Sequence, residues 1–311
     1  MPLLLPAVLA VFPAPFHRTL RVVEPPLQGP DVTVLQQLLR RINGTCALAC
    51  GCGCSHRYDA VTAKAVACYA NRTDGVFTEP TAHRVLAELS SDGWVDDGVP
   101  ASATGHLYKL LIPVHKNRSI ETTAVLLDAN NTKLFEFRVR THGHDASASG
   151  VPIPGRPWPD LVNGGVGLNQ FSSNGNTPTG LSELDLNSPE DSAKLYGPYP
   201  VQRFVRGLHG NAEFLLGPAV CATRSDAPAA VDAPVRAGIL VHTGAWANYS
   251  HWRPGAPMPN SAGCVHAYPA SVQALWQRLV KLGVQVRPNT DGKLPYPYRP
   301  QGLASVYEIG P

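Results

Sequence analysis

The residue types able to perform chemistry gather in one stretch of the chain. An apolar run ends at His242, and the segment Ser261-Ala-Gly-Cys-Val-His266 follows after one loop. A thiol is mostly protonated at neutral pH and becomes a nucleophile when a base or a cation lowers its pKa. A Cys264–His242 pair is therefore what nucleophilic acyl transfer requires, and Gly263 would allow the Cys264 amide to face a developing oxyanion.

Two other interpretations of these residues stay open. Cys264 could pair in a disulfide, with His242 making only a local hydrogen bond. His242, Cys264 and His266 could also bind a metal ion, but one thiol and two imidazoles lack a clear fourth ligand. We therefore expect no metal and no other cofactor.

A mostly β region is expected to position the thiol and the imidazoles. Residues 135–139 alternate apolar and charged side chains after an Asn130-Asn131 turn, which predicts a hairpin with residues 124–127 and one solvated face. Further strands are expected at 202–208 and 237–241, and a helix at 271–282. The 28 glycines and 30 prolines favour short strands joined by many turns.

The N-terminal third of the chain has a helical pattern instead. Apolar residues form one helical stripe after Asp31, a possible N-cap: Val32, Leu35, Leu38, Leu39 and Ile42. The segments 58–66 and 75–86 each resemble a turn followed by an apolar helix. These three helices would form a small unit ending near Trp94, and the turn-rich segment 92–105 would link it to the β region.

Two motifs resemble the L,D-transpeptidase catalytic domain. His242 followed by Ser261-Ala-Gly-Cys-Val-His266 is similar to the catalytic signature of that family, and Asn176-Thr-Pro-Thr-Gly180 resembles its Thr-Pro-x-Gly turn. The order of the expected hairpin, turn, signature and helix also agrees. The helical pattern upstream is similar to a peptidoglycan-binding three-helix module.

The resemblance implies an α+β fold in which a small N-terminal three-helix domain precedes a mostly β sandwich domain. The expected boundaries are an extended apolar segment at 1–30, a peptidoglycan-binding-like domain with a cysteine cluster at 31–98, a catalytic domain at 105–288 and a proline-rich tail at 289–311.

The resemblance also implies a role for each residue of the motif. Cys264 would be the nucleophile, His242 the general base, Ser261 an orienting group, and the amides of Gly263 and Cys264 the oxyanion hole. The family usually has histidine at position 262 and asparagine or arginine at position 266, where this chain has Ala262 and His266.

The implied substrate is a peptide stem of peptidoglycan or of another cell-wall polymer, whose acyl group would pass to the thiol and then to an amine or water. The alternative is a catalytically inactive structural glycoprotein with the same fold, acting as a self-assembling subunit of an extracellular array.

Sequons and cysteines indicate an extracellular, eukaryotic protein. Five asparagines fit the N-glycosylation acceptor motif: Asn43, Asn71, Asn117, Asn130 and Asn248. Five of the seven cysteines crowd one short region, at positions Cys46, Cys50, Cys52, Cys54 and Cys68. Disulfides suit a secreted protein; zinc binding by the cluster in a reducing compartment is the alternative.

Cysteine counting gives a further expectation. With Cys264 as a free nucleophile, six cysteines remain, and the five in the cluster cannot all pair among themselves. If all six are oxidised within the chain, Cys221 must bridge to the cluster. Otherwise Cys221 stays reduced or joins another chain.

Charge and hydropathy exclude several partner classes. The net charge is +3, and residues of both signs are spread along the chain. We therefore expect no positive potential strong enough to bind nucleic acid. The apolar stretch Leu3–Phe12 is interrupted by Pro6 and is too short to span a bilayer. It also lacks the basic start of a good signal peptide.

Overall fold

The computed structural model describes residues 12–42, 44, 46–48, 56–144, 168–189, 193–215, 235–244, 246, 256–288 and 299–310. The predictions for Asn43, Asn248, Cys50, Cys52, Cys54 and Cys221 lie outside the described residues.

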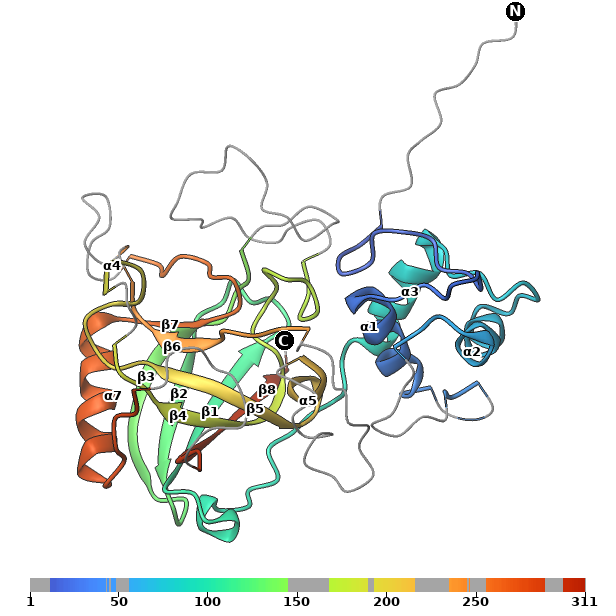
Figure 1. Cartoon of the computed structure of the whole chain (residues 1–311). Coiled ribbons are helices and arrows are strands. Elements are labelled where there is room, and N and C mark those ends of the chain that lie inside the picture. The colour runs from blue at the N-terminus through green and yellow to red at the C-terminus, as the bar shows by residue number, and fades with distance from the viewer. Residues whose placement is uncertain are drawn as a thin grey trace, which may run out of the picture.

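One closed barrel of eight strands forms the larger part of the molecule (Figure 1). The strands are β1 (Tyr108–His115), β2 (Thr122–Asp128), β3 (Lys133–Arg140), β4 (Gly180–Leu186), β5 (Gln202–His209), β6 (Leu240–His242), β7 (Val265–Ala267) and β8 (Gly302–Ile309). Around the barrel they follow the order β1-β2-β3-β7-β6-β5-β4-β8. The β1–β8 and β6–β7 pairs are parallel, and the other pairs are antiparallel.

The predicted fold class was wrong, because the sheet closes on itself instead of forming a sandwich. Closure depends on β8, which pairs with β1 on one side and β4 on the other. Residues 302–309 thus belong to the barrel and not to a proline-rich tail, which is the prediction for 289–311. A closed barrel leaves no unpaired edge, whereas a sandwich would leave several.

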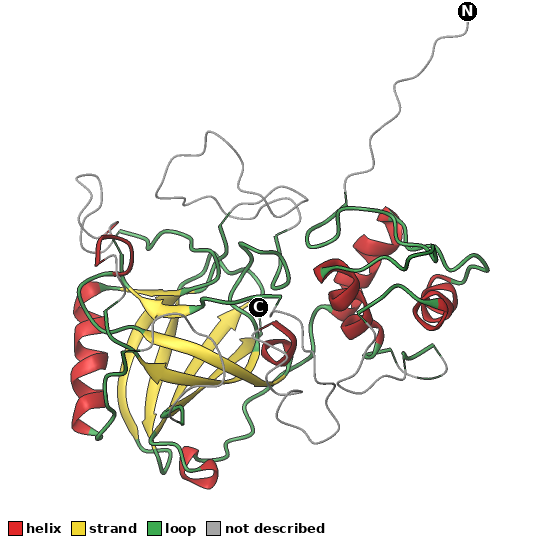
Figure 2. Ribbon diagram, viewed as in Figure 1, coloured by secondary structure: helices red, strands yellow, loops and turns green. Residues whose placement is uncertain are grey.

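Inward-facing apolar side chains fill the barrel. They include Leu110 and Ile112 of β1, Val241 of β6 and Val265 of β7, all at most 1% exposed. Helix α7 (Pro269–Lys281) packs its apolar stripe against β3 and adds Val272, Leu275 and Leu279 to the core. Figure 2 shows α7 on one side of the barrel and the N-terminal helices on the other.

The N-terminal helices are α1 (Pro30–Leu39), α2 (Ala60–Ala70) and α3 (Glu79–Leu89). They do not form a small separate domain, since their apolar core also contains Phe171 and Leu215 from the barrel part of the chain. Leu215 ends the short helix α5 (Asn211–Leu215); the other short helices are η1 (Ala101–Thr104) and α4 (Ala193–Tyr196). The N-cap of α1 is Gly29 and not Asp31, whose carboxylate binds Arg18 instead.

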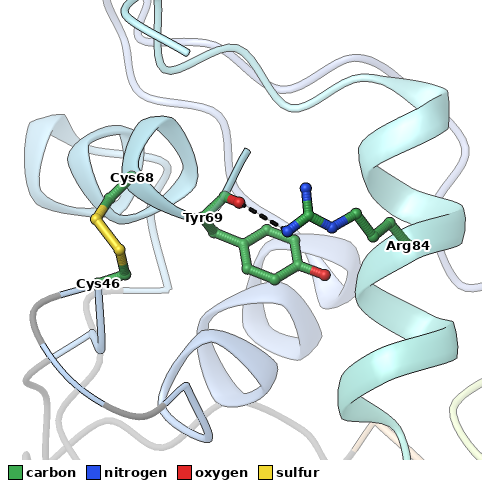
Figure 3. The surroundings of a disulfide bond; sticks show 4 residues. All are labelled: Cys46, Cys68, Tyr69 and Arg84. Carbon is green, nitrogen blue, oxygen red and sulfur yellow. Dashed lines mark hydrogen bonds between the residues drawn. A yellow bond between two sulfur atoms is a disulfide. The ribbon is translucent and has the colours of Figure 1, made fainter. Parts of the chain in front are cut away.

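A disulfide joins Cys46 to Cys68 and ties the segment after α1 to α2 (Figure 3). Beside it, Arg84 of α3 donates to the Tyr69 carbonyl at 3.1 Å, and its guanidinium lies 4.4 Å from the centre of the Tyr69 ring. The disulfide and the arginine thus hold α2 from two sides.

We expect Cys46→Ala to lower the free energy of unfolding by about 3 kcal/mol, because the cross-link spans 22 residues of sequence and restricts the unfolded chain. Urea denaturation of the purified variant would measure the change. Reduction of the wild-type protein with dithiothreitol should reproduce most of it. An unchanged unfolding midpoint in Cys46→Ala would show that this bridge does not stabilise the fold.

Candidate functional site: a cysteine and two histidines on the barrel wall

The thiol and the imidazoles lie on the same outer face of the barrel wall, where β6 and β7 run side by side. The register pairs Val241 with Val265 and His242 with His266. The two valines point into the core, so alternation directs Leu240, His242, Cys264 and His266 to the opposite face. Cys264 and His242 are diagonal neighbours on that face, with Cα atoms roughly 8 Å apart by ideal strand spacing.

The two histidine rings lie in contact with each other and with an aromatic neighbour. Their centroids are 4.9 Å apart and nearly perpendicular, and the Tyr196 ring lies 5.3 Å from that of His242. Nδ1 of His242 contacts the Thr243 carbonyl, and Nδ1 of His266 lies 2.8 Å from the Pro259 carbonyl. A carbonyl oxygen only accepts, so each Nδ1 carries the proton and each Nε2 is left as a base.

Burial keeps both imidazoles neutral. It lowers the pKa of His242 to about 4 and, helped by the neighbouring His242, lowers that of His266 to about 3. Each ring therefore has a neutral Nε2 throughout the physiological pH range.

Cys264 is a reduced thiol, 9% exposed, and is the free cysteine among the residues that the structure describes. It packs with Val201, Leu240 and Tyr196 in a small apolar cluster separate from the main core. Its thiol donates a hydrogen bond to the Gly238 carbonyl at 3.6 Å and not to His242. Burial raises the pKa of the thiol to about 11, and a hydrogen bond from the Leu240 main chain opposes this more than Arg236 and Arg203 do. At rest the site thus holds a neutral thiol beside neutral imidazoles.

Ser261 closes the turn that presents Cys264. Its hydroxyl donates to the Cys264 carbonyl at 2.6 Å and accepts from the Gly263 amide at 3.1 Å. Ser261 therefore orients the nucleophile segment. Because the Gly263 amide is engaged with Ser261, a substrate oxyanion would have to displace that bond or use the Cys264 amide.

The turn also rests on the segment that the second motif occupies. Thr177, in the Asn176–Gly180 motif, donates through Oγ1 to the Gly263 carbonyl at 2.9 Å, and the Ser261 amide donates to the His142 carbonyl at 3.0 Å. The two motifs recognised in the sequence are thus in direct contact.

Sequence reasoning missed Arg236, a 2% exposed residue whose guanidinium donates to the Ala262 carbonyl at 2.8 Å. The available signal was an arginine just before the apolar run that leads to His242. Arginines are rarely this buried, so the sequence alone gives little reason to select it.

In the described part of the chain, no cluster of three or more histidine, cysteine or acidic residues could hold a metal ion, and no helix is long and apolar enough to cross a membrane. A closed eight-stranded barrel with a thiol and two imidazoles on its outer wall is the class of structure observed. Comparison of the chain with protein-family models, curated proteins and solved structures found no match.

Acid should destabilise the fold through the two buried histidines. Their pKa values in the folded state lie below the usual value of about 6.5, so the unfolded chain binds protons first as the pH falls. Their stabilising effect is complete above about pH 6.5 and is lost as the pH falls towards 4 and 3. Each histidine should contribute about 1.4 kcal/mol of lost stability per pH unit between pH 6 and 4.5.

Denaturant unfolding at several pH values would measure this slope. The variant His266→Gln, which cannot take up the proton, should show a shallower slope than wild type. Equal slopes in the two proteins would mean that His266 is already charged or exposed in the folded state.

Proposed function

We propose that this protein carries out cysteine-dependent acyl transfer or amide hydrolysis on peptide stems of the peptidoglycan type. In this proposal Cys264 attacks the acyl carbon while the Nε2 of His242 takes the thiol proton. The tetrahedral intermediate then collapses: the C–N bond breaks, the leaving amine takes the proton from His242, and a thioester on Cys264 remains. An amine or a water molecule then takes the acyl group and regenerates the thiol.

The observation that carries the proposal is the shared face of β6 and β7. A reduced cysteine directly before β7 and a histidine with a basic Nε2 at the end of β6 lie on one face, and Tyr196 lies against both. The resemblance to the L,D-transpeptidase signature supplies the substrate class. Ala262 and His266 leave open whether the acceptor is an amine or water.

Mass spectrometry of the protein after incubation with an activated acyl probe and with synthetic peptide stems tests the proposal. A thioester on the peptide that contains Cys264, absent in Cys264→Ala, is the expected result. A probe adduct without any stem adduct would support thiol chemistry on another acyl donor. The absence of both adducts would overturn the proposal.

The alternative function is that of a catalytically inactive structural glycoprotein, a subunit of an extracellular assembly. The burial of Cys264 and the raised pKa of its thiol favour this alternative, because a thiol that stays protonated attacks slowly. A Cys264→Ala protein that assembles normally, together with an unmodified Cys264 in the wild-type protein, would establish it.

Secretion is part of both proposals and predicts glycans. Asn71, Asn117 and Asn130 are all exposed, as an acceptor must be. We expect sugars on at least two of the five sequons when the protein is secreted from eukaryotic cells. Peptide mass spectrometry before and after glycosidase digestion would locate them, and an unchanged mass would contradict secretion through a glycosylating pathway.

A further inference from the structure

Arg236 is a buried cation that lies against the turn carrying Cys264. Its guanidinium donates only to main-chain carbonyls: Ala262 at 2.8 Å, Gly175 at 3.2 Å, Gln170 at 2.8 Å and Asn176 at 3.3 Å. No carboxylate forms an ion pair with it among the described residues. Burying a guanidinium without a carboxylate is costly, so packing alone accounts poorly for this residue.

The guanidinium occupies the space directly beside Gly263, the residue before the thiol. Gly263 has φ +108°, and a Cβ built there would lie 1.9 Å from a terminal nitrogen of Arg236. Any other residue at position 263 would therefore push the cation away. The thiol of Cys264 is neutral at rest, and it is the ionisable group whose charge, once the thiol ionises, interacts with the Arg236 guanidinium.

One residue whose carbonyl holds Arg236, Gln170, is itself anchored through its side chain. The Gln170 side chain accepts from the Thr179 amide at 2.6 Å and from its hydroxyl at 3.1 Å, and the Asn211 amide group donates to that hydroxyl at 3.0 Å. Arg41, just after α1, donates to Asn211. Hydrogen bonds thus connect one of the four residues whose carbonyls hold the guanidinium, Gln170, to Arg41 beside α1.

We propose that Arg236 is a positioning residue for the reaction at Cys264: its guanidinium holds the Ala262–Cys264 turn in place and supplies the positive charge that stabilises the Cys264 thiolate. This inference rests on the proposed function. The carbonyls orient the guanidinium through their dipoles but leave its net charge unpaired, so the charge remains available to an anion at Sγ.

A test must distinguish the effect of Arg236 on the thiol pKa from the effects of other nearby groups. Arg203 of β5 is a second cation whose effect on the thiol pKa is smaller than that of Arg236. His242 and His266 are neutral, and Tyr196 keeps its proton because burial and the nearby Cys264 raise its pKa.

The test is the pH dependence of Cys264 alkylation by iodoacetamide, followed by mass spectrometry of the peptide that contains it. Alkylation reports the thiolate directly and needs no acyl substrate. The result for Arg236 is therefore independent of whether Cys264 performs acyl transfer. The variants are Arg236→Gln, Arg236→Lys and Thr177→Val. Thr177→Val is the matched control, because it removes a hydrogen bond to the same turn without changing any charge.

We expect Arg236→Gln to move the alkylation midpoint upwards by at least about one pH unit, which is a tenfold slower reaction at a fixed pH below the midpoint. Arg236→Lys should also move the midpoint upwards, because a lysine buried at this position loses its proton below the pH at which the thiol ionises. Thr177→Val should not move the midpoint.

An unmoved midpoint in Arg236→Gln, or an equal shift in Thr177→Val, would overturn the proposal. If Arg236→Gln does not fold, Arg236→Lys decides: an upward shift of about one unit supports the charge role, because the buried lysine is neutral at the midpoint, and a wild-type midpoint refutes it.

Discussion

His242→Gln should slow the acylation of Cys264 by about 10²- to 10⁴-fold, the range in which a general base contributes to proton transfer. The Nδ1–H of His242 contacts the Thr243 carbonyl, which leaves Nε2 as the base on the face that it shares with Cys264. Glutamine can keep a hydrogen bond to that carbonyl but cannot accept the thiol proton. The single-turnover rate with the activated acyl probe measures the effect.

The pH profile gives an independent check on the same residue. Since burial lowers the pKa of His242 to about 4, the base form persists well below the usual histidine range, and the rate should fall on the acid side only near pH 4. His115→Gln on β1, distant from the β6–β7 face, should leave the rate unchanged. A rate in His242→Gln within about threefold of wild type would remove His242 from the mechanism.

Gly302→Ala should lower the free energy of unfolding by about 4 kcal/mol, at the upper end of what overpacking costs. Gly302 begins β8 and pairs with Tyr108, and a Cβ at this position would lie 2.0 Å from the Tyr108 ring. That ring is fully buried and its hydroxyl contacts Gln202, so it cannot swing aside. The added methyl group would therefore separate β8 from β1 and weaken the closure of the barrel.

Two comparisons make this prediction specific. Gly310→Ala adds the same methyl group just after β8, where no atom lies within 4 Å, and should change stability by less than about 0.5 kcal/mol. In a Tyr108→Leu background, Gly302→Ala should cost clearly less, because the clash is gone. Equal costs in both backgrounds would show that Tyr108 is not the obstacle. Urea denaturation of the wild type, the three single variants and the double variant measures these differences.

The sequence by itself determined the helices and the hairpin whose apolar residues recur with a clear period or whose ends carry turn-forming residues. Alternation in 135–139 and the Asn130-Asn131 turn predicted the hairpin that β2 and β3 form. The apolar stripes predicted helices in the segments that α1 and α7 occupy. In these segments the decisive contacts are between near neighbours in the chain, so the pattern is visible without the fold.

The sequence also showed the separation of Cys264 and His242 along the chain. It did not show that the two residues share one face of the sheet. Cys264 and His242 share a face because β6 and β7 pair in parallel, with Val241 opposite Val265. Each of these strands is only three residues long, too short to show a period of two. Their register is set by the barrel core.

Only the tertiary structure decided the closure of the barrel and the surroundings of the thiol. β8 lies far along the chain from both its neighbours, β1 and β4, and no local pattern encodes such long-range pairing. Arg236 likewise reaches the Cys264 turn because carbonyls from residues 170–176 and 262 converge on it. Main-chain carbonyls are present at every residue, so a site built from them leaves no trace in the sequence.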